Sequence, residues 1–203
     1  MKKMLYYEKK LKKKGCDLVI GIDEAGRGPL AGPIVAAAVV LKKAYFKNRI
    51  DDSKKLTSLS RDKAFSEIIK KTDFGLGIIN EKIIDRLNIA VANRLVMEQA
   101  VDALISKLKP PKSSNIHIIV DGNVALNIKY PYTNIINGDG KSKSIACASI
   151  LAKVTRDRIM ELYDKMYPQY GFAKHKGYGT KGHRDVIKRI GLSNIHRKTF
   201  SCV

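Results

Sequence analysis

Four runs of apolar residues along the chain predict buried β-strands. The runs are bounded by proline, asparagine or charged residues and are five to eight residues long, which is typical of strands covered on both faces. They span residues 18–22, 34–41, 74–79 and 116–120. A turn rich in glycine and proline, at residues 26–33, separates the first two runs. We therefore expect these two strands to form one unit with a tight connection.

One long amphipathic helix is predicted between Ser144 and Met166. Its apolar residues recur at spacings of three and four, which places them in one stripe that we expect to face a core. The stripe consists of Ile145, Ala148, Ala152, Thr155, Ile159, Leu162 and Met166. Pro168 lies just beyond the last of them, where a residue that stops a helix is expected.

Three further helices complete the expected secondary structure. We predict a helix over residues 60–71 with Ser60 as its cap, and a helical stretch over residues 80–107 with Asn80 as its cap. A pair of prolines ends the second of these. A short helix is expected near residues 183–190. Strands interspersed with helices predict an α/β domain built of layers.

The chain has 203 residues and contains neither an internal repeat nor a flexible linker, so we expect one domain over residues 1–203. Within it we expect a basic N-terminal extension over about residues 1–16 and a C-terminal loop and helical part over about residues 168–203. Apolar residues make up 44% of the chain, which argues against general disorder. No surface stripe indicates self-association, and we expect a monomer.

The cysteines and the start of the chain indicate the compartment. Cys16, Cys147 and Cys202 are odd in number and lack the spacing of a zinc site, so we expect reduced thiols. The first residues are charged, unlike a secretory signal. The longest apolar run, residues 34–41, is much shorter than the ~20 residues of a membrane span. We therefore expect a cytoplasmic protein.

The charge of the chain predicts a polyanionic partner. The sequence holds 39 Lys and Arg against 19 Asp and Glu, a formal net charge of +20. Such a surplus favours nucleic acid, because phosphate neutralisation releases counterions. The lysines and arginines concentrate in residues 2–14 and 174–198. A generic basic surface is the alternative, and the lysine-rich start is either a solvated end or an additional phosphate-binding arm.

Four acids stand where apolar segments end: Asp23, Glu24, Asp121 and Asp139. A single acid in such a place is usually a solvated turn residue or a helix cap. Several of them in a strongly basic chain would repel one another unless cations held them together. Oxygen ligands select hard ions such as Mg²⁺ or Mn²⁺. Two such ions suit phosphodiester cleavage, so the pattern favours a metal-dependent nuclease.

Weaker signals lie in three loops. The glycines of Gly26-Arg27-Gly28 would permit close approach of the backbone to a substrate, although a tight strand connection also explains them. Ser53 and Lys54 offer donors for phosphate, or belong to a solvated loop. Tyr178 stands between glycines in a basic loop and could stack on a sugar or base, or could simply pack. The spacing of the histidines does not suggest a zinc site.

The sequence resembles ribonuclease HII, the bacterial type 2 ribonuclease H, from about residue 18 to residue 200. Five stretches carry the resemblance: Gly21 to Pro33, Asp52 to Leu56, Val120 to Gly122, Gly138 to Asp157, and His175 to Thr180. The first and fourth are long and specific. No large domain precedes the first of them in this sequence, which favours ribonuclease HII over its sister family, ribonuclease HIII. Cys147 stands where the family usually has a smaller residue such as alanine.

The resemblance implies a ribonuclease H-like fold, with a mixed five-stranded sheet flanked by helices and a helical C-terminal part. It implies a catalytic site in which the four acids named above hold Mn²⁺ or Mg²⁺, two ions during catalysis. It also implies substrate contacts through the backbone of the Gly26-Arg27-Gly28 turn and through stacking of Tyr178. The candidate phosphate contacts are Ser53, Lys54, Ser149 and Lys153.

The implied activity is hydrolysis of the RNA strand of RNA–DNA hybrids and incision 5′ of single ribonucleotides in duplex DNA, leaving 3′-hydroxyl and 5′-phosphate ends. Two other functions stay open. A basic protein that binds nucleic acid without cutting it would gain nothing from acids at the ends of its strands. A junction resolvase would share the metal chemistry but not the substrate.

Overall fold

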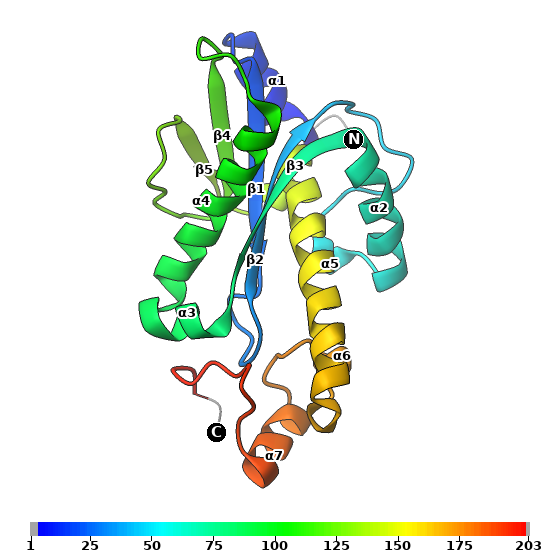
Figure 1. Cartoon of the computed structure of the whole chain (residues 1–203). Helices are drawn as coiled ribbons and strands as arrows, with labels where there is room; N and C mark the ends of the chain where they lie inside the picture. The colour runs from blue at the N-terminus through cyan, green and yellow to red at the C-terminus, as the bar shows by residue number, and fades with distance from the viewer. Residues whose placement is uncertain (1–3, 202–203) are drawn as a thin grey trace.

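The computed structural model describes residues 4–201, so Cys202 and the first two lysines of the basic N-terminal run lie outside the described residues. Five strands form one mixed sheet in the order β3-β2-β1-β4-β5 (Figure 1). The strand β2 (Ile34–Leu41) runs antiparallel to both β1 (Leu18–Ala25) and β3 (Thr72–Ile79), whereas β4 (Ile116–Asp121) pairs parallel with β1. The predicted mixed five-stranded sheet is confirmed.

The fifth strand, β5 (Tyr132–Ile135), pairs parallel with the outer side of β4. The pattern of apolar residues did not predict it. It is four residues long, it lies at the edge of the sheet, and only Ile135 in it is buried. An edge strand of this kind needs no apolar run, because one side of it stays open to solvent.

Helices cover both faces of the sheet. One face packs against α4 (Ile89–Leu108), and the other packs against α5 (Lys143–Met166) and α2 (Ser58–Lys71) (Figure 1). Side chains at Gly75 and Gly77 of β3 would collide with backbone atoms of α4, so these glycines let that helix lie directly on the sheet. The layered α/β arrangement follows the prediction.

Two predicted helix boundaries differ from the structure. Thr57, and not Ser60, caps α2: the Thr57 side chain accepts a hydrogen bond from the backbone N–H of Ser60. The stretch predicted over residues 80–107 is broken at Asn88, which has a φ of 68°. The break separates α3 (Glu81–Leu87) from α4, and the Asn88 side chain caps α4. A non-glycine residue at positive φ is uncommon, although asparagine tolerates it best.

The predicted apolar stripe of α5 is wrong for its last two residues. Ile145, Ala148 and Ala152 are buried, but Leu162 and Met166 are 60% and 64% exposed. The helix continues beyond the sheet, toward the C-terminal elements α6 (Phe172–His175) and α7 (Lys181–Ile190) (Figure 1). It packs there with another face, through the buried Met160. A stripe continued by periodicity cannot anticipate this change of partner.

The N-terminal extension forms a helix, α1 (Tyr6–Lys13), which is attached to the sheet. Tyr7 and Leu11 pack against the cluster around Val19, Ile119 and Ile145. Short 3₁₀ helices also occur in the loops: η2 (Ser53–Lys55), η3 (Gly138–Gly140) and η4 (Pro168–Tyr170). Within residues 4–201, none of the helices combines the length and apolar character needed to cross a membrane.

Candidate active site

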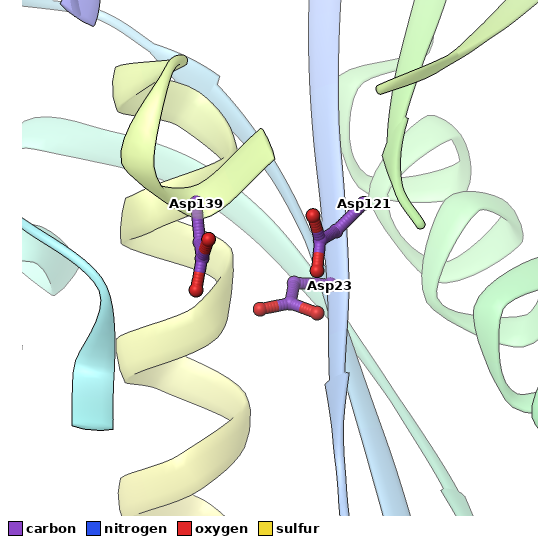
Figure 2. Close-up of side chains that lie close together, drawn as sticks. All are labelled: Asp23, Asp121 and Asp139. Atoms are coloured by element: carbon purple, nitrogen blue, oxygen red, sulfur yellow. The ribbon is translucent and has the colours of Figure 1, made fainter. Parts of the chain in front are cut away.

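Asp23 and Asp121 lie side by side near the ends of two parallel strands. The register pairs Ile22 of β1 with Val120 of β4, so the next residue on each strand is one of the two acids. Successive side chains of a strand point to opposite faces. Asp23 therefore lies on the same face as Val19 and Gly21, which is the face covered by α5. Figure 2 shows the two carboxyl groups next to each other.

Asp139 reaches this place because η3 and the start of α5 approach the sheet closely. A side chain at Gly21 would lie 2.5 Å from backbone atoms of Ser144 and Ile145, so only glycine permits the approach. The backbone N–H of Gly138 then donates a hydrogen bond to the Asp121 carboxylate. Carboxylate oxygens of Asp23, Asp121 and Asp139 all lie within 4.8 Å of one another (Figure 2).

Glu24 is the one predicted acid outside this group of three. It follows Asp23 directly, so the alternation of the strand directs its side chain away from that of Asp23. It faces the same pocket, described below, and its carboxylate lies 3.8 Å from the Arg27 guanidinium. The structure thus brings three of the four acids together and places the fourth beside them.

Burial and neighbouring carboxylates favour the protonated forms of these acids. Burial raises the pKa of Asp23, and the Glu24 and Asp121 carboxylates raise it further. Burial raises the pKa of Glu24 to about 7, although Arg27 opposes the shift. Burial and the carboxylates of Asp121 and Asp52 raise the pKa of Asp139 to about 6. A bound cation would favour the charged forms of all these groups.

The donor set fits a hard divalent ion. Asp23, Asp121 and Asp139 offer only carboxylate oxygens, and no histidine or cysteine joins them among the described residues. Oxygen donors at this mutual distance suit Mg²⁺ or Mn²⁺ better than zinc. The three converging acids are therefore a candidate metal site.

A pocket of about 600 Å³ opens beside the acids. All eight residues that the sequence analysis proposed as substrate contacts line it, together with three of the acids; Asp139 is the one predicted site residue outside the lining. The predicted lining residues are Asp23, Glu24, Gly26, Arg27, Gly28, Ser53, Lys54, Asp121, Ser149, Lys153 and Tyr178. Segments from five distant parts of the chain thus meet around one space.

The turn at Gly26-Arg27-Gly28 is held from behind by two buried arginines. Arg197 donates to the carbonyl oxygens of Gly26 and Arg27, and Arg156 donates to that of Pro33. In a trans peptide the N–H points opposite to the C=O, so the N–H groups of Arg27 and Gly28 point away from Arg197. The turn therefore offers backbone donors on the side that the arginines leave open.

The two glycines of this turn have different structural roles. Gly26 has a φ of +107°, and a side chain there would collide with Arg156. Around Gly28 no atom would lie within 4 Å of an added Cβ. The prediction that glycine permits close approach of a substrate therefore applies to Gly28, whereas Gly26 is required by the packing of Arg156.

Tyr178 is brought to the pocket by contacts between the C-terminal loop and the Gly/Pro turn. The backbone N–H of Leu30 donates to the Gly177 carbonyl at 2.8 Å, and a side chain at Gly177 would lie 2.5 Å from the Ala31 oxygen. The Tyr178 ring is 43% exposed, and the Lys153 ammonium lies 5.7 Å from its centre. The ring is thus available at the rim of the pocket.

The four candidate phosphate contacts differ in how free their groups are. The Ser149 hydroxyl donates to that of Ser53 at 3.0 Å, and both residues are buried. The Lys153 ammonium forms an ion pair with Asp157 at 2.7 Å. Lys54 is exposed, and its charge lowers the pKa of Glu24. Of the four, Lys54 is best placed to meet an incoming phosphate.

Four residues important to this site were missed by sequence reasoning. Asp52 raises the pKa of Asp139, Arg156 and Arg197 hold the Gly/Pro turn, and Glu8 binds the start of α5. A lone acid in the lysine-rich start was the only signal for Glu8. The rings of His175 and His183 stack on each other at 4.2 Å.

Comparisons with known proteins agree with this geometry. A family model described as Ribonuclease HII matches residues 20–203. The ribonuclease HII of Acholeplasma laidlawii is 47% identical over 201 residues, which cover 98% of this chain and 95% of that protein. The crystal structure of ribonuclease H2 from Pyrococcus horikoshii is similar with a TM-score of 0.71 and 28% identity, covering 91% of this chain and 94% of that one.

A third similarity concerns the fold alone. A structure of Bst-RNase HIII in complex with Mn²⁺ matches with a TM-score of 0.72 at 17% identity, over 91% of this chain and 67% of that chain. It supports the same sheet and helix arrangement.

Proposed function

The chain belongs to the ribonuclease HII family of metal-dependent endonucleases, which act on RNA–DNA substrates, and we propose that it both cuts the RNA strand of hybrids and incises 5′ of single ribonucleotides in duplex DNA. The observation that carries the proposal is the convergence of Asp23, Asp121 and Asp139 beside a pocket with basic side chains in its lining. Positive side chains hold a nucleic-acid strand, whereas the acids hold metal.

Asp23, Glu24, Asp121 and Asp139 would hold divalent ions, Mg²⁺ or Mn²⁺, with two ions present during catalysis. Bound there, the ions would supply activation of the attacking water and stabilisation of the leaving oxygen, which gives 3′-hydroxyl and 5′-phosphate ends. Glu24 lines the pocket, so its carboxylate faces the space where the scissile phosphate would lie. The nearby Arg27 guanidinium lowers the pKa of Glu24 and so favours its charged form.

The rim of the pocket would distinguish RNA from DNA. The 2′-hydroxyl is the group that identifies a ribonucleotide. The outward N–H groups of Arg27 and Gly28 are donors that could bind it, and the open space at Gly28 lets a sugar approach. The exposed Tyr178 ring would stack on the deoxyribose of the following nucleotide. Together these contacts would read a ribonucleotide followed by DNA.

The direct test is the Asp121→Asn variant on a duplex that contains one ribonucleotide. We expect incision by the wild type with Mg²⁺ or Mn²⁺ and none with EDTA. The variant should bind the duplex but fail to cut it, because one carboxylate of the group is lost. Asp102→Asn, an exposed change on α4, is the matched control and should cut normally. Metal-dependent activity retained by Asp121→Asn would remove Asp121 from the site.

Substrate competition separates the alternatives. A junction resolvase would prefer an all-DNA four-way junction over the ribonucleotide-containing duplex. A protein that only binds nucleic acid would retain both substrates uncut in the presence of either metal. Either outcome would overturn the proposal.

A further inference from the structure

We propose that α1 and the adjoining end of η3 form a second contact with the substrate, a basic groove that binds phosphates of the duplex outside the catalytic pocket. The inference rests on the proposed function. The groove has a volume of about 840 Å³ and lies between the two elements. We define it by its lining residues Tyr6, Tyr7, Lys9, Lys10, Lys13, Lys14, Gly140 and Lys141.

The groove carries unbalanced positive charge. Some lysines elsewhere on the surface form ion pairs, as Lys42 does with Asp73 and Lys176 with Glu161. In residues 4–201 no carboxylate lies within ion-pair distance of any of the five groove lysines, whereas ten ion pairs form elsewhere. Such a concentration of cations attracts a polyanion.

The only acid of α1 is removed from this surface. Glu8 is buried, and its carboxylate accepts hydrogen bonds from the Ser142 hydroxyl and from the backbone N–H and hydroxyl of Ser144. The side chain that could neutralise the lysines thus binds the start of α5 instead. The same bonds attach α1 to the start of α5, so the helix that carries these lysines is positioned before a ligand binds.

The groove adjoins the catalytic acids. Gly140 and Lys141 follow Asp139 directly, so a single turn separates the groove from the candidate metal site. On its other side Gly140 approaches the Lys55 ammonium of η2, whose neighbours Ser53 and Lys54 line the catalytic pocket. Basic side chains therefore continue from Lys54 in the pocket, through Lys55, which also pairs with Asp51 and Asp52, to Lys141 and α1. A duplex is a rigid polyanion with one charge per ~1.7 Å of its axis, and it fits such a track.

The test compares two variants that lose the same charge. The groove variant changes Lys9, Lys10, Lys13 and Lys14 to Gln. The control variant changes four other exposed lysines, which also form no ion pair and three of which line another depression: Lys107, Lys109, Lys112 and Lys129. Binding of a duplex with one ribonucleotide is measured in EDTA at several salt concentrations, and cleavage is measured with Mg²⁺.

We expect duplex binding by the groove variant to depend less on salt, because each lost phosphate contact lowers the slope of log K against log[salt] by ~0.9. A decrease of about 2 to 4 is expected, against less than about 1 for the control. KM should rise while kcat at saturation is unchanged. Extending the duplex by one helical turn on one side of the ribonucleotide should tighten wild-type binding and leave the groove variant unaffected.

Equal slopes of log K against log[salt] for the two variants would overturn the proposal. The groove would then be a candidate site for a protein partner. If the four changes unfold the protein, the pairs Lys9 with Lys10 and Lys13 with Lys14 are changed separately, each with half the expected effect. The proposed function fails independently: a wild type that cuts no ribonucleotide-containing duplex, yet binds duplex DNA through these lysines, would disprove the activity and keep the groove.

Discussion

The Arg156 guanidinium occupies the space into which a side chain at Gly26 would project. Arg156 comes from α5, and it also donates hydrogen bonds to the carbonyls of Ala31 and Lys176. One buried cation thus joins the long helix, the Gly/Pro turn and the C-terminal loop that carries Tyr178. The shape of the pocket rim depends on this junction.

Alanine at Gly26 should destabilise the protein, whereas alanine at Gly28 should leave its stability almost unchanged. Gly26→Ala places a Cβ against Arg156 and 2.7 Å from the Pro33 oxygen, at a φ that disfavours alanine. We expect a loss of about 2 to 4 kcal/mol in the free energy of unfolding, measured by denaturant titration. Gly28→Ala meets open space and should change that free energy by less than about 0.5 kcal/mol.

The Gly28→Ala variant also tests whether the substrate approaches the turn. If a sugar approaches Gly28, the added methyl group should raise KM for a single-ribonucleotide duplex about tenfold or more, equivalent to ~1.4 kcal/mol. Its stability serves as the internal control. An unchanged KM for Gly28→Ala would mean that the substrate does not come close to this position.

Asp23→Asn should stabilise the protein when no metal is present. The pKa of Asp23 is raised by burial and by the carboxylates around it, so its charge costs free energy in the folded state at neutral pH. We expect a gain of about 1 kcal/mol in EDTA, measured by denaturant unfolding at pH 8. Mg²⁺ or Mn²⁺ should stabilise the wild type and have less effect on the variant, because ligand binding adds to stability only where the site is intact.

Asp102→Asn is again the matched control. It should change neither the stability in EDTA nor the stabilisation by metal. A variant at Asp23 that is less stable than the wild type in EDTA would show that the carboxylate is needed for folding. It would also argue against strain among the three acids.

A residue could be placed from the sequence only where its position followed from its own segment of the chain. Asp23 and Asp121 could be predicted because each directly follows an apolar strand, and parallel strands bring such residues to one edge. Strand alternation also predicts that the Glu24 side chain points away from that of Asp23. Glu8 could not be placed, since its partner Ser144 is 136 residues away. Such a contact exists only once α1 has packed on the sheet.

The same reasoning explains the errors in the fold. The four-residue edge strand β5 leaves no apolar run, and Asn88 breaks a helix without a proline or glycine. Leu162 was assigned to a core because periodicity was continued past the end of the sheet. At Leu162 the spacing of apolar residues is regular, but the packing partner of the helix changes and decides which face is buried.

A buried histidine pair should make the C-terminal part sensitive to acid. The Nε2 atoms of His183 and His196 lie 3.0 Å apart. Burial lowers the pKa of His183, and burial together with His183 lowers that of His196 to about 4. The unfolded chain takes up these protons near pH 6.5, before the folded protein does. The contribution of the neutral histidine pair to the stability of the C-terminal part is therefore complete above pH 6.5, and it is lost as the pH falls toward 4.

Hydrogen exchange of the α7 amides measures this effect locally. After correction for the intrinsic rate, protection of α7 should decrease between pH 7 and pH 5, while that of β1 should change less. A local measurement is needed because the acids of the candidate site, whose pKa values are raised, shift global stability in the opposite direction. The variant His196→Gln should show a weaker pH dependence, and an unchanged dependence would contradict the role of the pair.

Tyr178 should matter most where a ribonucleotide is followed by DNA. The backbone N–H of Tyr178 donates to the His175 carbonyl, so removing the ring leaves the loop in place. Tyr178→Ala should lower kcat/KM for a single-ribonucleotide duplex about 5- to 150-fold, the equivalent of ~1–3 kcal/mol of stacking. Tyr178→Phe keeps the ring and should retain most of the activity. In a long hybrid the next sugar is a ribose, so Tyr178→Ala should lose less activity there, and equal losses on the two substrates would show that the ring does not read the junction.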